Sequence, residues 1–463
     1  MRKFMSDDYL ITNNTAKKIY KRIKDLPIFD YHCHLSPEEI LEDKTFYNLT
    51  ELWLLGDHYK WRVMRNYGVE ERLVTGDAPA YDKFFAFASA LPSFIGNPVY
   101  HWAHLELKQY FGITTPLSAK TAKDIWDKTV KMMADGSFSA RKLIAGSNVD
   151  TVGTTDDPTS ALKAHEELAK AGLPFTVVPS FRPDNAINIE KPVFAQYINK
   201  LAAASGFKTE TFDGLVSALK NRLDYFVDHG CVATDVSFTD FPKGTGDEEK
   251  ANKALQDVLA GKKIAKEEEG EFKYCILKRL GGLFAERNLV MQVHTGVLRN
   301  QNTSRFAAIG ADCGIDSVGN ALDIEAGGKL FDDIEKTYGL PKTIVYTLNP
   351  NSYYPLATMI GDFAGQIGGK LQLGAAWWFM DHRDGIREQL HIFADTAGLG
   401  LFNGMLTDSR SFVSYARHDY FRRIFCSVIG EWVEAGEYPD DLEELVTLAG
   451  NVAFYNAKKY FTR

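Results

Sequence analysis

The chain has 463 residues, 45% of them hydrophobic and 25% charged, and a net charge of −8 at pH 7. These values are typical of globular proteins and argue against disorder or a fibrous repeat. The acidic balance argues against nucleic-acid binding, which needs clustered Lys and Arg on one face. The length fits two or three domains, or one barrel with a large insertion.

The cysteines and the N-terminal region indicate the cellular compartment. The five cysteines are scattered without CxxC spacing, which is typical of reduced thiols and argues against a zinc ribbon or a disulfide framework. The first 31 residues lack the apolar core of a secretory signal, and no stretch of 18 apolar residues occurs. We therefore expect a cytoplasmic protein that binds neither membranes nor nucleic acids, with a homo-oligomer left open.

Short apolar, β-branched runs recur along the chain, each followed by a polar cluster and then by a helical pattern. This alternation is typical of βα units, and eight of them predict a closed (β/α)8 barrel of the TIM type. A doubly wound open sheet is the competing arrangement. The runs cover residues 27–31, 149–154, 175–179, 230–236, 289–293, 343–347, 371–376 and 401–407.

A long segment, residues 35–148, separates the first run from the second and is rich in aromatic and helix-forming residues. We interpret it as a helical insertion that covers the mouth of the active site, because strand-to-helix loops gather there. The predicted division is residues 1–34 with the first strand, 35–148 as the insertion domain, and 149–463 as the rest of the barrel. The charge-rich residues 250–271 are interpreted as a solvated helix or loop.

Two histidines, His32 and His34, directly follow the first run. Residues i and i+2 of a strand project to the same face, so both imidazoles can reach one metal ion. Two histidines that merely cap a strand are the alternative. Their position at a strand end, just before a helix start at Ser36, favours the metal site.

Two imidazoles alone bind a divalent ion poorly, so a further ligand is expected from another strand end. Asp408 ends the eighth run and fits best, because the first and eighth strands of a closed barrel are neighbours. An N-cap of the following helix is its alternative role. His294 ends the fifth run and is a candidate ligand or substrate-binding residue, with a packed core histidine as the alternative.

Arginines follow several of the predicted strands, namely Arg182, Arg299 and Arg410. The guanidinium fork matches both oxygens of a carboxylate, so these residues predict an anionic substrate. Ordinary surface ion pairs are the alternative for each of them. Trp377 and Trp378, after the seventh run, are candidate walls for a sugar ring, with core packing as the alternative.

Five sequence blocks, taken together and in this order, resemble the uronate isomerases, also called glucuronate isomerases, of the amidohydrolase superfamily. The resemblance extends over nearly the whole chain and implies a barrel like that of metal-dependent hydrolases. It also implies reversible conversion of D-glucuronate to D-fructuronate, and of D-galacturonate to D-tagaturonate, in sugar-acid catabolism. The blocks are residues 29–37, 56–62, 180–184, 377–379 and 407–412.

The resemblance further implies one divalent metal ion, expected to be zinc, and a set of site residues. Hydrolytic relatives bridge two metals with a carboxylated lysine on the fourth strand, and the fourth run has no lysine, which favours a mononuclear site. The implied residues are His32, His34 and Asp408 for the metal; Asp408, His58, Tyr59 and Arg410 for catalysis; and Arg182, His294, Arg299, Trp377 and, on a shorter motif, Asp235 for the hexuronate.

Two other functions remain open on the sequence alone. A metal-dependent hydrolase of the same superfamily would use the same ligands to activate water. A non-catalytic sugar-acid binding protein would have no reason to combine a metal pair with His, Asp and Tyr side chains. The sequence also leaves open which of the three arginines binds the C6 carboxylate.

Overall fold

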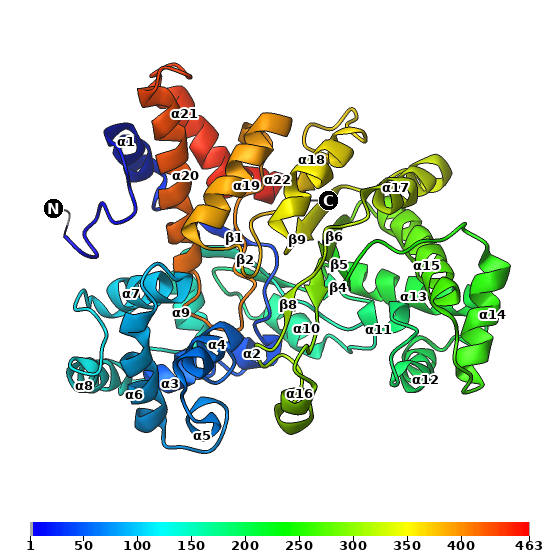
Figure 1. Ribbon diagram of the computed structural model, residues 1–463, viewed down its shortest axis with the longest axis horizontal. Helices are drawn as coiled ribbons and strands as arrows, with labels where there is room; N and C mark the ends of the chain where they lie inside the picture. Colours follow the sequence, from blue (N-terminus) through cyan, green and yellow to red (C-terminus); the bar gives the residue numbers. More distant parts are fainter. Residues whose placement is uncertain (1–2, 463) are drawn as a thin grey trace.

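Seven of the eight apolar runs form β-strands, and these strands assemble into two parallel sheets (Figure 1). The computed structural model describes residues 3–462. One sheet has the order β1-β2-β3 and the other β10-β9-β6-β5-β4. The strands are β1 (Ile28–Asp30), β2 (Val149–Gly153), β3 (Thr176–Val178), β4 (Ser180–Phe181), β5 (Ala233–Phe238), β6 (Val290–Thr295), β9 (Thr343–Thr347) and β10 (Leu371–Leu373), with a separate antiparallel pair of β7 (Val297–Leu298) and β8 (Ser317–Val318).

The two sheets adjoin at Pro179, which lies between β3 and β4. Proline has no amide hydrogen and interrupts the ladder at this point. The neighbouring chain nevertheless bonds to both sides of it: Thr154 N–H donates to Val178 O at 3.0 Å, and Ser180 N–H donates to Thr154 O at 3.0 Å. β3 and β4 therefore continue one another along the same neighbour.

The prediction of an eighth strand over residues 401–407 was wrong. Gly404, with a φ of 71°, interrupts the extended backbone. The amide of Asn403 donates to the Gln372 side chain at 3.1 Å, and that of Thr407 donates to the Asp30 carboxylate at 2.8 Å. Because these amides bond to side chains, no regular backbone ladder forms.

The same segment still lies beside the chain that leaves β1. Asp408 N–H donates to His32 O at 3.2 Å, and His34 N–H donates to Ser409 O at 3.0 Å. The last segment and the first strand are therefore connected by backbone hydrogen bonds at the point where both run into the predicted site residues.

Residues 35–148 fold into helices without a strand, as their composition predicts. In Figure 1 these helices, blue to cyan, lie to one side of the sheets, and α11 to α15 lie to the other. The first group is α2 (Pro37–Leu41), α3 (Leu49–Trp53), α4 (His58–Tyr67), α5 (Glu71–Val74), α6 (Ala80–Ala90), η1 (Leu91–Ser93), α7 (Pro98–Phe111), α8 (Ala122–Met133) and α9 (Ala140–Gly146).

The other helices connect the strands or gather near the chain ends, where α1 packs against α20 and α21. None of the described helices is both long and apolar enough to cross a membrane. They are α1 (Asn14–Ile23), α10 (Lys163–Lys170), α11 (Asp184–Ile187), α12 (Phe194–Ser205), α13 (Phe212–Asp228), α14 (Glu248–Leu259), α15 (Lys266–Glu286), α16 (Thr303–Ile309), α17 (Ile324–Tyr338), η2 (Pro350–Ser352), α18 (Tyr353–Gly361), α19 (Arg383–Thr396), η3 (Leu399–Leu401), α20 (Ala416–Glu434), α21 (Leu442–Gly450), the π-helical turn η4 (Asn451–Tyr455) and α22 (Asn456–Tyr460).

One buried cluster joins side chains from both sheets and from the last segment. It includes Phe29 of β1, Ala233 of β5, Val290 of β6, Ile344 of β9 and Leu406 of the segment that precedes Asp408. Side chains that pack together exclude water from a shared core. Side chains of the two sheets therefore share one buried core.

We expect Gly404→Ala to lower the free energy of unfolding by about 2–4 kcal/mol. A Cβ at this position would lie 2.2 Å from the carbonyl oxygen of Val452, and the left-handed φ adds strain. Urea-induced unfolding measures the change. Gly361→Ala is the matched control, because Gly361 lies in α18 with no positive φ and no atom close to an added Cβ. Equal stability of the two variants would contradict the packing described for the last segment.

Candidate active site

His32, His34 and Asp408 meet where the last segment lies beside the end of β1. The Nε2 atoms of His32 and His34 lie 3.3 Å and 3.0 Å from Asp408 Oδ1. One ligand atom from each residue lies within 4.8 Å of the others, so the group could hold a metal ion. The structure thus brings together the three residues that the sequence suggests as ligands.

The backbone around Asp408 is held from both sides by buried charged residues. Asp30 accepts hydrogen bonds from the amide and the hydroxyl of Thr407, at 2.8 Å and 2.6 Å, and Arg417 donates to Thr407 O at 2.8 Å. Asp408 itself has a left-handed φ of 44°, a conformation that costs free energy for a residue other than glycine. Trp377 Nε1 donates to Asp408 Oδ2 at 2.7 Å. These bonds aim Oδ1 at the two histidines.

The protonation states of Asp408 and His34 suit a cation. Burial would raise the pKa of Asp408, but hydrogen bonds from His32 and His34 hold that pKa well below its usual range. Burial lowers the pKa of His34 to about 4. Thr155 Oγ1 lies 2.7 Å from His34 Nδ1 and orients the ring. Burial would lower the pKa of His32, but its hydrogen bond to Asp408 raises that pKa above the usual value. At neutral pH the ionised Asp408 carboxylate thus faces the neutral imidazole of His34, and metal binding needs ligands in these forms.

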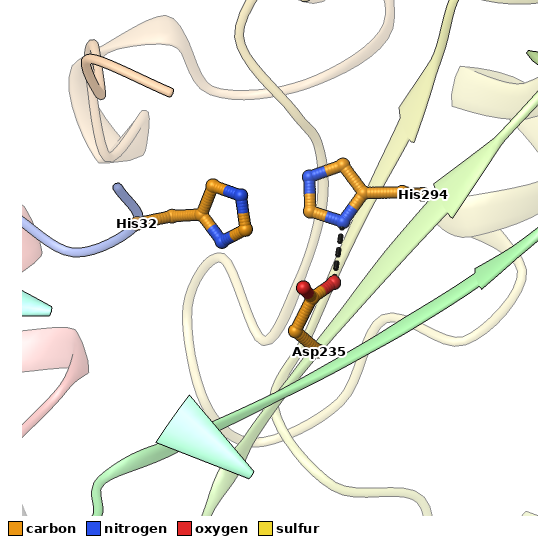
Figure 2. Close-up of side chains that lie close together, drawn as sticks. All are labelled: His32, Asp235 and His294. Atoms are coloured by element: carbon orange, nitrogen blue, oxygen red, sulfur yellow. Dashed lines mark hydrogen bonds and ion pairs between the residues drawn. The ribbon is translucent and has the colours of Figure 1, made fainter. Parts of the chain in front are cut away.

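A second group of candidate metal ligands shares His32 and includes Asp235 of β5 and His294 of β6 (Figure 2). All three residues are buried. His294 Nδ1 lies 2.7 Å from Asp235 Oδ1. Because an ionised carboxylate only accepts hydrogen bonds, Nδ1 carries the proton and Nε2 keeps its lone pair. Among the described residues this Nε2 has no partner, so it is available to a ligand.

A cavity of about 380 Å³ opens beside these histidines. All the predicted site residues line it except Tyr59 and Asp235. The lining consists of His32, His34, His58, Thr155, Asp157, Arg182, Asp184, Asn185, Lys191, His294, Arg299, Asp312, Trp377, Trp378, Asp408 and Arg410. Its charged and hydrogen-bonding groups suit a small polar anion better than an apolar ligand.

The two predicted residues that do not line the cavity lie directly behind it. Asp235 is fully buried and pairs with His294 and with Arg182, 3.2 Å away. Tyr59 donates its hydroxyl to Asp381 Oδ2 at 2.7 Å, and burial raises its pKa well above the usual value. Asp235 thus supports two residues that line the cavity, His294 and Arg182, while the Tyr59 hydroxyl bonds to Asp381, which does not line it.

His58 is the first residue of α4, and Asp57 caps that helix. The Asp57 carboxylate accepts from the amide of Tyr59 at 2.9 Å and from the Lys60 ammonium at 2.7 Å. The His58 ring stacks on Tyr59 with centroids 5.0 Å apart and meets Trp378 edge-on at 4.8 Å. Burial lowers the pKa of His58, so the imidazole is neutral. A buried ion pair within the first turn of α4 thus orients a neutral histidine toward the cavity.

Some residues of the cavity were not predicted, namely Thr155, Asp157, Asp184, Asn185, Lys191 and Asp312. Thr155 follows β2, so the rule that polar residues gather at strand ends could have identified it. Asp312 lies between α16 and β8, and no signal of that kind points to it.

Parallel strands whose carboxyl ends meet at one polar cavity define an α/β protein with an enzyme-like site. The sequence profile of the glucuronate isomerase family matches residues 1–461. The chain therefore belongs to the glucuronate isomerase family. The resemblance inferred from the sequence blocks, and the aldose–ketose isomerase class that it implied, are confirmed.

Individual relatives agree with this assignment. The chain is 49% identical to a uronate isomerase of Caldanaerobacter subterraneus subsp. tengcongensis, over 99% of both chains. It is similar to the crystal structure of the Thermotoga maritima uronate isomerase, with a TM-score of 0.94, 34% identity and full coverage of both chains. The crystal structure of the Caulobacter crescentus glucuronate isomerase matches with a TM-score of 0.91 and 26% identity, over 99% of this chain and 96% of that one.

Proposed function

We propose that this chain interconverts D-glucuronate and D-fructuronate, and D-galacturonate and D-tagaturonate. The observation that carries the proposal is the ionised Asp408 carboxylate, which faces His32 and His34 at a cavity lined by three arginines. The arginines suit the carboxylate of a uronate, and the relatives are named for this activity. Family membership favours this reaction over hydrolysis of a sugar-acid derivative and over non-catalytic binding.

We further propose that the two sheets close into a (β/α)8 barrel, with residues 35–148 as an insertion domain over its mouth. The support is the hydrogen bonding of residues 408 and 409 to the end of β1, and the buried cluster shared by both sheets. In such a barrel the carboxyl ends of the strands form the catalytic face. Helix α4 of the insertion brings His58 to that face.

The proposed cofactor is one zinc ion held by His32, His34 and Asp408. Two imidazoles and one carboxylate are the donor types that catalytic zinc sites use, and such sites keep a position open for substrate. When bound, the ion would act as a Lewis acid toward a substrate oxygen. The absence of a lysine that could bridge two metals from the fourth run, residues 230–236, agrees with a single ion.

Proton transfer from C2 to C1 is assigned to Asp408, acting directly or through a substrate hydroxyl. Its pKa lies below the usual range, so Asp408 is ionised at neutral pH and ready to accept a proton. A carboxylate of such low basicity needs the developing enediolate to be stabilised. Neutral His58 and the Arg410 guanidinium, both at the cavity, are assigned to that task.

The other residues would bind and orient the open-chain sugar. His294 offers a lone pair at Nε2 to a substrate hydroxyl, and Asp235 fixes that tautomer. Trp377 forms part of the wall, while Arg182 and Arg299 add positive charge. Tyr59 would act through His58, on which it stacks, rather than by touching the substrate. The cytoplasmic location and the absence of nucleic-acid and membrane partners stay predictions.

The first test is a coupled assay on glucuronate and galacturonate with and without a chelator. We expect ketose formation that is lost after chelation and restored by zinc, because Asp408 and the histidines would need the ion to orient the sugar. Hydrolysis of a uronic-acid amide or lactone without ketose formation would support a hydrolase instead. Full activity after complete metal removal would contradict the proposed cofactor.

The second test uses glucuronate deuterated at C2. Removal of this proton by Asp408 predicts a primary isotope effect on kcat/KM and exchange of the transferred hydrogen with solvent at C1. Asp408→Asn should lower kcat by several orders of magnitude, and Glu335→Gln, a change on α17, should not. Absence of both the isotope effect and the exchange would favour a hydride shift.

A further inference from the structure

Thr155 follows β2 and lies beside His34, and the backbone on either side of Thr155 is fixed. The amides of Thr154 and Asp156 donate to carbonyl oxygens of β3 and β4, both at 3.0 Å. The Thr154 hydroxyl also donates to Asp156 Oδ2 at 2.6 Å, whereas Thr155 and Asp157 line the cavity. This alternation is that of extended backbone, in which successive side chains point to opposite faces. The fold therefore aims the Thr155 side chain at the cavity.

The Thr155 hydroxyl has two hydrogen-bond partners and a single hydrogen to offer them. Its Oγ1 lies 2.7 Å from His34 Nδ1 and 3.2 Å from the carbonyl oxygen of Cys33. The carbonyl oxygen only accepts, whereas Nδ1 accepts or donates according to which ring nitrogen carries the imidazole proton. When the hydroxyl donates to Cys33, its oxygen can still accept a hydrogen bond from His34. The hydroxyl can therefore bond to either tautomer of the imidazole.

Metal binding requires His34 to change its tautomer. With the ring proton on Nε2, that nitrogen donates to Asp408 Oδ1, 3.0 Å away, and Nδ1 accepts from the Thr155 hydroxyl. A cation at Nε2 needs the lone pair of that nitrogen, so the proton then resides on Nδ1. Nδ1–H then donates to Thr155 Oγ1, and the hydroxyl hydrogen turns to Cys33 O. The proton passes from Nε2 to Nδ1 through solvent, and the ring keeps its bond to Thr155.

The two candidate ligand histidines differ in how their rings are held. The His32 side chain is 2% exposed and is fixed by packing, and its Nδ1 has no hydrogen-bond partner within residues 3–462. The His34 side chain is 23% exposed, so packing restricts its ring less. Histidines that bind metals usually donate their second N–H to a fixed acceptor, which sets the orientation of the ring. For His34 that acceptor is Thr155.

We infer that Thr155 is a positioning residue whose hydroxyl lets His34 exchange its Nε2 proton for a metal ion without losing a hydrogen bond. The inference rests on the proposed zinc site and deepens it, because it assigns part of the metal affinity to a residue outside the ligand set. Without the hydroxyl, Nδ1 would lose this partner in both tautomers. Removal of such a partner lowers metal affinity about 10–100-fold in proteins.

The test measures how tightly the full-length, zinc-loaded protein retains zinc when a chelator of known affinity is added at neutral pH. Thr155→Val keeps nearly the same shape and removes the hydroxyl, so we expect the Kd for zinc to rise about 10–100-fold. Thr155→Ser keeps the hydroxyl and should retain zinc as the wild type does. Thr155→Ala differs from the serine variant only by the hydroxyl oxygen and should lose zinc as readily as the valine variant.

Two further measurements separate this effect from a general loss of stability. Thr176→Val makes the same change at an exposed position of β3 and should leave the zinc affinity unchanged. Nitrogen-15 NMR of the histidine-labelled, zinc-loaded wild type reports the tautomer directly. We expect His34 to carry its proton on Nδ1 and to bind zinc through Nε2, with its signals assigned by their loss in His34→Gln.

Unchanged zinc affinity in Thr155→Val would overturn the inference, as would equal loss of zinc by the serine and valine variants or coordination of His34 through Nδ1. A wild type that holds no zinc would overturn it together with the proposed cofactor. Isomerisation of glucuronate by the zinc-loaded wild type, measured in parallel, reports on the proposed function alone. A wild type that forms no ketose but holds zinc in a manner that depends on the Thr155 hydroxyl would refute the proposed reaction and retain the role of Thr155.

Discussion

The short contact between Asp408 and the two histidines at the end of β1 is the interaction on which the rest of the structure depends. It joins a residue near the C-terminus to residues near the N-terminus, and the adjacent backbones are hydrogen-bonded to each other. A carboxylate of low pKa would be unfavourable at this buried position without hydrogen-bond donors. The histidines supply those donors, and a cation that replaced their Nε2 protons would be held by the same three side chains.

Holding Asp408 in place requires features that a regular strand would not have. The left-handed backbone of Asp408 is maintained by hydrogen bonds to its neighbour Thr407. Asp30 accepts from the amide and the hydroxyl of Thr407, and Arg417 donates to its carbonyl oxygen. Arg417 also lies over the rings of Tyr59 and Trp102, at 5.0 Å and 4.1 Å. The same guanidinium thus contacts the backbone next to Asp408 and packs against residues of helices α4 and α7. Strain at the candidate ligand is offset by this buried polar framework, a pattern common at functional sites.

Much of the fold and site could be predicted from local sequence patterns. Seven strands follow from short β-branched runs, and the rule that polar residues gather at strand ends identified His32, His34 and Asp408. The eighth strand failed because its pattern of apolar residues does not reveal that neighbouring amides bond to Asp30 and Gln372. Such side-chain bonds join residues more than 30 positions apart, and a single sequence does not display them.

The orientation of side chains relative to the cavity also could not be predicted from the sequence. Tyr59 follows His58 directly and stacks on its ring, yet the Tyr59 hydroxyl extends to Asp381 rather than to the cavity. Asp312 reaches the cavity through a loop held by α4, a contact between segments some 250 positions apart. Predictions based on strand ends identify site residues that directly follow strands. They miss residues that reach the cavity from longer loops.

The central claim is that His32, His34 and Asp408 form the metal site, rather than the deeper group of His32, Asp235 and His294. Anomalous diffraction at the zinc absorption edge, from crystals of the zinc-loaded protein, tests it most directly. The account predicts one ion about 2.0–2.2 Å from an Nε2 of each of His32 and His34 and from an oxygen of Asp408. An ion bound by Asp235 and His294 instead, with Asp408 outside its coordination sphere, would contradict it.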